Sequence, residues 1–368
     1  KQFNEEESDN SGFEGAIVLD PKTGMYLDDP ISVLDYASLY PTSIKEKNLS
    51  HNTYLGEYEQ VKDKLDNLGW KEIEDYNRIK YLDYEYINKP GTTVVEKKPV
   101  MIEKINEKGE TIETHKEIDC VFLTPKKKRG IVPLVTSELL SARKRTKKLL
   151  AAEKDESKKK VLDGYQLAYK LTANSVYGQL GAKTSSISFK KIAACTTAIG
   201  RNRIYDARRL VVKWADDGIW RKYVGNNEFY NGITNISSEV IYGDTDSVFV
   251  KFIIEKGDGI IIKGKDALPI CIQCGKDSGT YITEQLHVED KAPQDLEYEK
   301  TFYPFILISK KRYTGEKYEF TADETPKRTS MGLVTKRRDN APIVKYVYGN
   351  LLEIIMKQKD LDKAKSWL

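Results

Sequence analysis

The sequence predicts a mixed α/β fold of the α+β type, with a β-hairpin and long helices. Two runs of β-branched and aromatic residues, 240–242 and 248–250, flank a short turn and predict a β-hairpin. A further apolar run at 305–308 predicts another strand. From residue 131 to about 177 the apolar residues recur at helical spacing instead. The chain is therefore expected to combine sheet and helix.

The composition is that of a globular protein. With 368 residues, 39% of them hydrophobic, the chain can bury a substantial core and is expected to form two or three domains or subdomains. The 60 basic and 56 acidic residues give a net charge of only +4, so net charge does not indicate a nucleic-acid partner. No apolar run approaches the roughly 18 residues that span a bilayer, so a soluble protein without a membrane partner is expected.

Four cysteines are too few for a disulfide framework, which indicates a reducing compartment. Cys271 and Cys274 form a single C-x-x-C pair, and we expect two small thiols in the core or at the surface of a helix. The chain is expected to be a fragment of a longer protein, because residue 1 is not Met and residues 364–368 end within a helical pattern.

Two acidic residues, Asp244 and Asp246, lie at the tip of the predicted hairpin, where Gly243 and Asp244 are expected to supply the turn. Carboxylates one residue apart repel each other, and a bound cation offsets that repulsion. The hairpin therefore suggests a Mg²⁺ site. Two other interpretations are open at this point: a solvated polar loop, and the D-x-D motif of metal-dependent glycosyltransferases.

A third acidic residue, Asp35, follows a short predicted strand at 31–34. Pro41 can take the first position of the helix that comes next. A carboxylate at a strand end beside a loop is well placed for chemistry, although an aspartate that caps a helix or stabilises a turn has the same pattern. Upstream, residues 13–30 are expected to form a strand and a hairpin that turns at 21–24.

Two predicted helices, 131–150 and 158–177, are joined by a short charged break and form an antiparallel helical hairpin. Each helix carries two polar residues four positions apart, which lie on one face: Arg143 and Lys147 on the first helix, and Lys170 and Asn174 on the second. The basic faces can converge on one volume. The alternative is that each basic run only solvates a surface helix.

The acidic residues and the helical hairpin together match phosphoryl transfer on a nucleoside triphosphate. That reaction uses divalent ions to clamp the attacking and leaving oxygens, and cations to hold the departing phosphates. Asp35 and Asp246, from neighbouring strands, would supply metal ligands, and the helical hairpin would supply the phosphate clamp.

Three motifs resemble, in order and spacing, the polymerase motifs of family B DNA polymerases: DYASLYP at 35–41, KLTANSVYG at 170–178 and YGDTDS at 242–247. Four further segments are similar to that family: FEGA at 13–16 to its linker, KKRY at 310–313 to its primer-holding motif, and SARKRTKK at 141–148 and KKRGIVP at 127–133 to its delta-type branch. The resemblance covers about residues 13–368. It implies a polymerase palm with an antiparallel sheet, helical-hairpin fingers and the start of a helical thumb.

The resemblance also implies roles for individual residues. Asp35 and Asp246 would hold two Mg²⁺ ions with help from the Tyr36 carbonyl, and Asp244 would be a catalytic residue nearby without being a full ligand. The implied nucleotide-binding residues are Ser38 and Leu39 through their backbone, Arg143, Lys147 and Lys170 at the triphosphate, Asn174 in the pocket, and Tyr177 and Gly178 at the nascent base pair. Tyr40 would stack under the sugar and exclude a 2′-hydroxyl. The implied DNA-binding residues are Lys310, Lys311, Arg312 and Tyr313.

The implied function is that of a DNA-directed DNA polymerase, a nucleotidyltransferase that adds dNMP to a primer 3′-hydroxyl by two-metal phosphoryl transfer. Expected partners are primer-template DNA, dNTPs and a sliding-clamp processivity factor. The expected location is intracellular, in a host nucleus or a cytoplasmic virus factory if the source is viral. The alternatives are a non-catalytic DNA-binding homologue, disfavoured because the aspartates and the clamp cations are all present, and a protein-primed family B polymerase.

The expected organisation is palm at 1–54, an insertion or peripheral subdomain at 55–118 with a surface hairpin at 104–112, a connection at 119–130, fingers at 131–180, palm again at 181–335 and the start of a thumb at 336–368. The insertion exceeds the delta-type connection and suggests an addition of the kind that large DNA viruses carry. Two residues depart from the family pattern: Thr42 replaces a usual Ser, and Phe13 replaces the linker Tyr and loses one phenolic hydrogen bond.

Overall fold

The computed structural model describes residues 11–88, 95–105, 110–257, 259–288, 292–335 and 340–368. The chain forms two compact units, and each unit is built from separate stretches of sequence. Unit 1 comprises Lys1–Ala16 and Ser38–Arg201, and unit 2 comprises Ile17–Ala37 and Asn202–Leu368. Parts of three expected subdomains lie outside the described residues: 1–10, 258 and 289–291 of the palm, 89–94 and 106–109 of the insertion, and 336–339 of the thumb.

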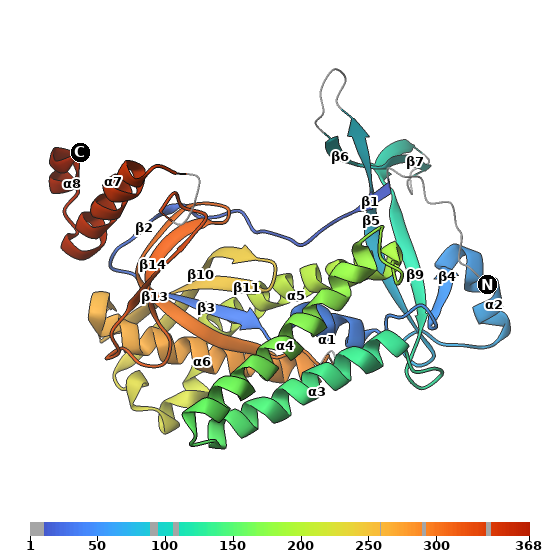
Figure 1. Cartoon of the computed structure of the whole chain (residues 1–368), viewed down its shortest axis with the longest axis horizontal. Coiled ribbons are helices and arrows are strands. Elements are labelled where there is room, and N and C mark those ends of the chain that lie inside the picture. Colours follow the sequence, from blue (N-terminus) through green and yellow to red (C-terminus); the bar gives the residue numbers. More distant parts are fainter. Residues whose placement is uncertain (1–10, 89–94, 106–109, 258, 289–291, 336–339) are drawn as a thin grey trace. The chain divides into compact units, whose positions relative to one another are not determined.

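Unit 1 contains an antiparallel sheet with β5 at its centre (Figure 1). Its strands are β1 (Ser11–Phe13), β4 (Tyr54–Glu57), β5 (Tyr76–Asn88), β6 (Val95–Pro99) and β9 (Glu117–Leu123). The order is β1-β5-β9-β4, and β6 also pairs with β5. β7 (Met101–Ile105) and β8 (Thr111–His115) pair separately, which confirms the predicted surface hairpin, although its turn lies outside the described residues.

The helices of unit 1 include the predicted helical hairpin, formed by α3 (Ile131–Ala152) and α4 (Glu156–Gly181) (Figure 1). Asp155 caps α4, because its side chain accepts hydrogen bonds from the N–H groups of Ser157 at 2.8 Å and Lys158 at 3.2 Å. The other helices are α1 (Leu39–Glu46), α2 (Tyr58–Asn67) and α5 (Lys190–Asp216), which passes into unit 2 after Arg201. The helical hairpin is confirmed.

The core of unit 1 combines its sheet and its helices. Buried members include Ile79 and Tyr81 on β5, Ile118 and Phe122 on β9, Ile44 on α1, Leu180 on α4 and Ile199 on α5. Strands from the expected insertion therefore share a core with the helices. Lys191 on α5 is buried as well, and its Nζ lies 3.3 Å from a carboxylate oxygen of Glu57.

Unit 2 is built on an antiparallel sheet, as predicted. Its strands are β2 (Gly24–Tyr26), β3 (Ile31–Tyr36), β10 (Ile233–Asp244), β11 (Ser247–Lys256), β12 (Ile260–Ile262), β13 (Leu296–Ser309), β14 (Arg312–Tyr318) and β15 (Lys327–Met331). The order is β10-β11-β3-β13-β14-β15, with β12 paired to β11 and β2 paired to β13. β3 is a central strand, which explains why residues 31–34 are all buried and mostly apolar.

The two faces of this sheet differ. Helix α6 (Gly264–Val288) covers one face, where Ser32 Oγ donates a hydrogen bond to the Cys271 carbonyl oxygen at 2.9 Å (Figure 1). The opposite face carries an aromatic cluster, made of Ile31, Val33, Ile241, Tyr242, Phe249, Phe302, Phe305, Leu307 and Tyr313. Because side chains alternate along a strand, Asp35 belongs to the face of the aromatic cluster.

Short helices complete unit 2. They are the 3₁₀ segments η1 (Ile219–Asn226) and η2 (Glu228–Tyr230), then α7 (Pro342–Glu353), the π-helical segment η3 (Ile354–Gln358) and α8 (Leu361–Trp367). Leu352 and Met356 pack with Ile306 and Leu333 in a separate small core. No helix in the described part of the chain is long and apolar enough to cross a membrane.

The predicted strand and hairpin at 13–30 do not form. Between β1 and β2 the chain instead follows the outer edge of β10. The Leu19 N–H donates to the Gly243 carbonyl at 2.9 Å, and the Lys22 N–H donates to the Ile241 carbonyl at 2.8 Å. The hydrogen-bonding partners of this segment therefore come from a strand more than two hundred residues away, and not from its own neighbours.

The C-x-x-C pair belongs to the core, as expected. Cys271 and Cys274 are free thiols that are completely buried on α6. Burial raises the pKa of the Cys274 thiol well above its ordinary value, which keeps the sulfur protonated. Both residues act as small apolar side chains at this position.

The aromatic cluster should dominate the stability of unit 2. Phe302 is completely buried in it, and replacing Phe302 with Ala should lower the free energy of unfolding by about 3–5 kcal/mol, because a cavity is left behind. Phe320 provides a matched control, since it is 70% exposed and its replacement by Ala should change stability by less than about 0.5 kcal/mol. Urea unfolding of the two variants measures this difference, and equal midpoints would contradict the assignment.

Candidate active site

The acidic turn of unit 2 joins β10 to β11. Asp244 and Ser247 form a cross-strand pair, and Thr245 and Asp246 are the two turn residues between them. The prediction that Gly243 and Asp244 supply the turn is wrong. Gly243 lies inside β10 and is needed for close approach, since an added Cβ would lie 2.7 Å from Cδ1 of Leu19.

The turn has a strained backbone. Thr245 has a φ of 60°, in the left-handed region that a β-branched residue rarely adopts. Its N–H donates to the Ile17 carbonyl at 3.0 Å, and its Oγ1 donates to Asp244 Oδ1 at 3.0 Å. The surrounding hydrogen bonds thus hold an unfavourable conformation, and such strain is concentrated at functional sites.

Asp35 and Asp246 come together at one end of neighbouring strands, which confirms the predicted arrangement. In the pairing of β3 with β11, Asp35 lies opposite Ser247, the residue after Asp246. Directly opposed residues of antiparallel strands have Cα atoms about 4.5–5.5 Å apart. The Tyr36 N–H donates to the Asp246 carbonyl at 2.8 Å and attaches the turn to β3.

The donors at this position suit a hard divalent cation. Mg²⁺ in proteins is usually held by one or two carboxylates, and waters and substrate phosphates complete its octahedron. Among the described residues, no group of three or more His, Cys, Asp or Glu side chains could hold a metal by itself. Two aspartates fit an ion of this kind, whose remaining ligands are waters and substrate phosphates. Tyr36 can add only its backbone, because its hydroxyl donates to the Arg203 carbonyl at 2.8 Å.

Asp244 has a different environment from Asp246. Its carboxylate oxygens lie 2.5 and 2.8 Å from Nζ of Lys311. The Tyr242 hydroxyl donates to Asp244 Oδ2 at 3.3 Å and accepts a hydrogen bond from the Lys311 N–H at 2.9 Å. Asp244 is thus bound to the basic turn, a geometry that agrees with a supporting role.

The KKRY segment contains the turn between β13 and β14. Ser309 and Arg312 are paired, so Lys310 and Lys311 are the turn residues, and Lys311 has a φ of 60°. The side chains of Lys310, Lys311 and Arg312 are exposed. Tyr313 is only 7% exposed within the aromatic cluster, so little of its side chain is available to a binding partner.

Lys310 is also paired with an acid. Its Nζ lies 2.7 Å from Asp20 Oδ1, and this lysine lowers the pKa of the Asp20 carboxyl through a hydrogen bond and its charge. Asp20 belongs to the segment that follows the edge of β10. Both lysines of the turn therefore have carboxylate partners in unit 2.

In unit 1, α1 begins at the DYASLYP motif. Ser38 precedes the helix in a left-handed conformation, with φ 58° and ψ 56°. The Ser38 carbonyl accepts hydrogen bonds from the Thr42 N–H at 3.1 Å and from Thr42 Oγ1 at 2.9 Å. Thr42, which stands where the family usually has Ser, therefore uses the hydroxyl that the two residue types share. The first N–H groups of a helix have no partners within it and can bind an anion.

Tyr40 contacts Tyr177. The two ring centroids are 4.3 Å apart and the rings are tilted by 35°. Burial raises the pKa of the Tyr177 hydroxyl, and the positive charge of Arg201 acts in the opposite direction. The residues predicted to contact the sugar and the base pair are therefore neighbours within unit 1.

The predicted clamp cations lie on the helical hairpin. Arg143 on α3 is half-buried, and its Nε donates to Gln166 Oε1 on α4 at 3.5 Å. Lys147 on α3, and Lys170, Asn174 and Gly178 on α4, are exposed. Gln166 precedes Lys170 by one turn, so the Arg143 contact brings the two polar faces together.

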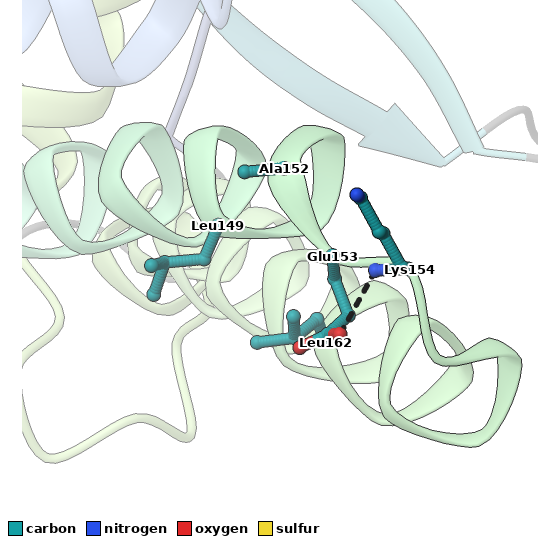
Figure 2. Close-up of a pocket in the computed structure, with 5 residues that line it drawn as sticks. All are labelled: Leu149, Ala152, Glu153, Lys154 and Leu162. Atoms are coloured by element: carbon teal, nitrogen blue, oxygen red, sulfur yellow. Dashed lines mark hydrogen bonds between the residues drawn. The ribbon is translucent and has the colours of Figure 1, made fainter.

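The tip of the helical hairpin carries a shallow hollow (Figure 2). It is lined by Leu149, Ala152, Glu153, Lys154 and Leu162, and Glu153 Oε1 accepts a hydrogen bond from the Lys154 N–H at 2.9 Å. None of the predicted clamp residues lines it. The hollow is therefore separate from the candidate nucleotide-binding residues of unit 1.

Two neighbours of the site residues are not predicted from the sequence. Tyr242 is predicted as a strand residue within the YGDTDS motif, but the link of its hydroxyl to Lys311 spans 69 positions and has no local signal. Glu297 on β13 lies opposite Asp35 in the pairing of β13 with β3. The alternating pattern of LEYEK at 296–300 could have indicated that this carboxylate is exposed. It could not have indicated which strand lies beside it.

Comparison with known proteins shows the family of the chain. The family model for DNA polymerase family B matches residues 2–367. A DNA polymerase of Pyramimonas orientalis virus is 35% identical over an alignment that covers 100% of this chain and 29% of the relative.

Delta catalytic subunits are also similar. That of Candida albicans is 32% identical over 98% of this chain, and that of Caenorhabditis elegans is 34% identical over 97% of it. The chain spans 28% and 26% of the lengths of these two proteins. These relatives confirm the delta-like resemblance, and the chain belongs to DNA polymerase family B.

Proposed function

We propose that this chain carries the nucleotidyl-transfer core of a DNA-directed DNA polymerase, which adds a dNMP to a primer 3′-hydroxyl. The observation that carries the proposal is the meeting of Asp35 and Asp246 at one end of β3 and β11, in a chain of family B. The primer 3′-oxygen forms a bond to the α-phosphorus of the dNTP. The bond from that phosphorus to the β-phosphate oxygen breaks, and pyrophosphate leaves.

Asp35 and Asp246 are the proposed ligands of two Mg²⁺ ions, with the Tyr36 carbonyl as a further ligand. When bound, such ions stabilise the charge on the attacking and leaving oxygens. The protein holds the carboxylates in place: the register of β3 with β11 positions Asp35, and the Tyr36 N–H holds the Asp246 carbonyl at 2.8 Å. This preorganisation is the expected contribution of the protein to catalysis.

The triphosphate is the proposed partner of the unit 1 cations. Arg143, Lys147 and Lys170 would stabilise the negative charge that develops on the departing pyrophosphate. The N-terminus of α1, with the backbone of Ser38 and Leu39, offers N–H groups that have no partner within the helix to the same anion. Asn174 would complete the pocket, and Tyr177 and Gly178 would face the nascent base pair.

Tyr40 is the proposed sugar gate. Its ring packs on Tyr177 at a centroid distance of 4.3 Å, so it presents a supported wall to the sugar. A supported ring can exclude an added hydroxyl by steric overlap. This role follows from the family motif and is consistent with the packing.

Primer-template DNA is the proposed macromolecular partner, and the exposed Lys310, Lys311 and Arg312 are its proposed contacts. Lys311 is held in position by Asp244 and Tyr242. A sliding clamp as a processivity partner, and an intracellular location in a host nucleus or a virus factory, belong to the same proposal.

The metal assignment predicts a large loss of activity in Asp246→Asn. One metal ligand loses its charge, so primer extension by the full-length protein at saturating Mg²⁺ should slow by about a hundredfold or more. Asp217→Asn is the matched control, since Asp217 is exposed in unit 2 and outside the candidate site, and it should keep the normal rate. Undiminished extension by Asp246→Asn would end the proposal.

The sugar gate predicts altered selectivity in Tyr40→Ala. Removing the ring should lower the ratio of kcat/KM for dATP to that for ATP by about tenfold or more, because the 2′-hydroxyl is no longer excluded. Tyr165→Ala is the control, since Tyr165 is 58% exposed on α4. Single-nucleotide incorporation measures both ratios, and equal ratios in the two variants would remove the gate assignment.

The Tyr242 hydroxyl predicts a pH-dependent stability difference. Burial raises the pKa of Tyr242 from 10.0 to about 12, with a smaller increase from Asp244 and an opposing hydrogen bond from the Lys311 N–H. Tyr242→Phe removes the hydroxyl and its hydrogen bonds, so the free energy of unfolding should fall by about 1 kcal/mol at neutral pH. The pKa of Tyr242 is higher in the folded protein than in the unfolded chain. The extra stability of the wild type over Tyr242→Phe is therefore complete below pH 10 and is lost as pH rises through 12. Denaturant unfolding from pH 7 to 12 tests this, and a constant difference would contradict it.

A further inference from the structure

Gly200 on α5 lies behind the proposed sugar gate. This glycine is buried in unit 1, and an added Cβ would lie 3.2 Å from Cε1 of Tyr40. The same Cβ would lie 3.3 Å from Cδ2 of Leu39, the first residue of α1. Both distances are shorter than ordinary van der Waals contact between carbon atoms, which is optimal at about 3.5–4.0 Å. A side chain at position 200 would therefore require these neighbours to move by a few tenths of an ångström.

The Tyr40 ring is confined on a second side. Tyr177 lies 4.3 Å away between ring centroids, and Tyr177 is itself partly buried against the core of unit 1. The backbone of α5 at Gly200 and the ring of Tyr177 therefore both contact the gate residue. Leu39 is only 3% exposed, whereas Tyr40 is only partly buried, so the ring is the neighbour with more room to move away from a methyl group at position 200.

Helix α5 itself cannot easily retreat. Arg201, the next residue, is buried, and its guanidinium donates to the carbonyl oxygens of Glu14 at 2.9 Å and Gly15 at 2.8 Å. The Thr197 hydroxyl donates to the same Glu14 carbonyl at 2.9 Å. These bonds fix α5 to residues 14–15 within unit 1. An added Cβ would consequently displace Tyr40 and not the helix.

Other glycines of unit 1 lack this relationship. At Gly181, at the end of α4, an added Cβ would meet Ala193 Cβ at an ordinary 3.6 Å. At Gly164, within α4, nothing lies within 4 Å of an added Cβ. A change at Gly164 therefore tests the general effect of replacing a helical glycine, without any contact to the gate.

We propose that Gly200 is a positioning residue for nucleotide selection: the missing side chain sets where the Tyr40 ring lies and so sets the discrimination between deoxyribose and ribose. The inference rests on the proposed function, because it takes Tyr40 as the sugar gate. It adds a residue from a separate helix, 160 positions from Tyr40, whose effect on sugar discrimination is transmitted through that ring.

The test is a double-mutant cycle in the full-length protein. Four proteins are compared by single-nucleotide incorporation of dATP and ATP: wild type, Gly200→Ala, Tyr40→Ala and the double variant. In Gly200→Ala, the ratio of kcat/KM for dATP to that for ATP should fall by about fivefold or more, because displacements well below 1 Å already weaken a fitted site. The loss should reside mainly in the KM for dATP. In the Tyr40→Ala background, Gly200→Ala should change the ratio by less than about twofold.

Matched controls separate positioning from general damage. Gly164→Ala should keep the wild-type ratio, and all variants should bind primer-template DNA equally. If Gly200→Ala is poorly folded, a double variant that combines Gly200→Ala with Leu39→Ala takes its place. It relieves the close contact with Leu39 and keeps the contact with Tyr40. The ratio of kcat/KM for dATP to that for ATP should fall by the same factor in this variant.

Two results would overturn the inference: an unchanged ratio in folded Gly200→Ala, or an equal fall in the Tyr40 and Tyr40→Ala backgrounds. The proposed function fails by a different result, in which the wild-type protein does not incorporate dATP at all.

Discussion

The acidic site depends on the register of β3 against β11. With Asp35 opposite Ser247, the carboxylate lies on the face of the aromatic cluster and beside Asp246. A shift by one residue would exchange Asp35 with Leu34 and turn the charge toward α6. An unpaired charge buried there would cost several kcal/mol. The buried apolar residues of β3 and the hydrogen bond between Tyr36 and Asp246 both oppose such a shift, so the packing that forms the sheet also positions the carboxylates.

Three residues in the motifs of the candidate site have a strained backbone. Ser38, Thr245 and Lys311 all have positive φ values close to 60°, although none of them is glycine. Each belongs to a motif that resembles family B polymerases, and each ends or begins a regular element. Their neighbours maintain these conformations: Thr42 binds the Ser38 carbonyl, and the Tyr242 hydroxyl binds the Lys311 N–H. The strain is consistent with sites shaped for binding at some expense of local stability.

Much of this architecture could be predicted from local pattern. The strands around Asp246 and the helical hairpin of α3 and α4 follow from apolar spacing alone, because side-chain period is a local property. The location of the turn at Thr245 could not be predicted, since Gly243 serves a contact with Leu19 and not a turn. The path of residues 17–22 was also beyond prediction, because its hydrogen-bond partners lie on β10.

The residues of the candidate site could also be predicted only in part. The motifs identify Asp35, Asp246 and Tyr40, but the pairing of Lys311 with Asp244 joins residues 67 positions apart and needs the folded sheet. Gly200 is an extreme case, because the relevant property is an absent side chain. A sequence records that residue as a small helical position and contains no sign of the ring beside it.

The segment that follows β10 has a consequence for the whole sheet. An exposed edge strand offers unpaired N–H and carbonyl groups, and another chain can extend the sheet by adding to it. Here the N–H groups of Leu19 and Lys22 bind carbonyls of β10, and the Thr245 N–H binds the Ile17 carbonyl. The end of β10 that leads into the acidic turn is thus covered by its own chain. This covering blocks the addition of another strand beside the acidic turn, and with it one route to aggregation.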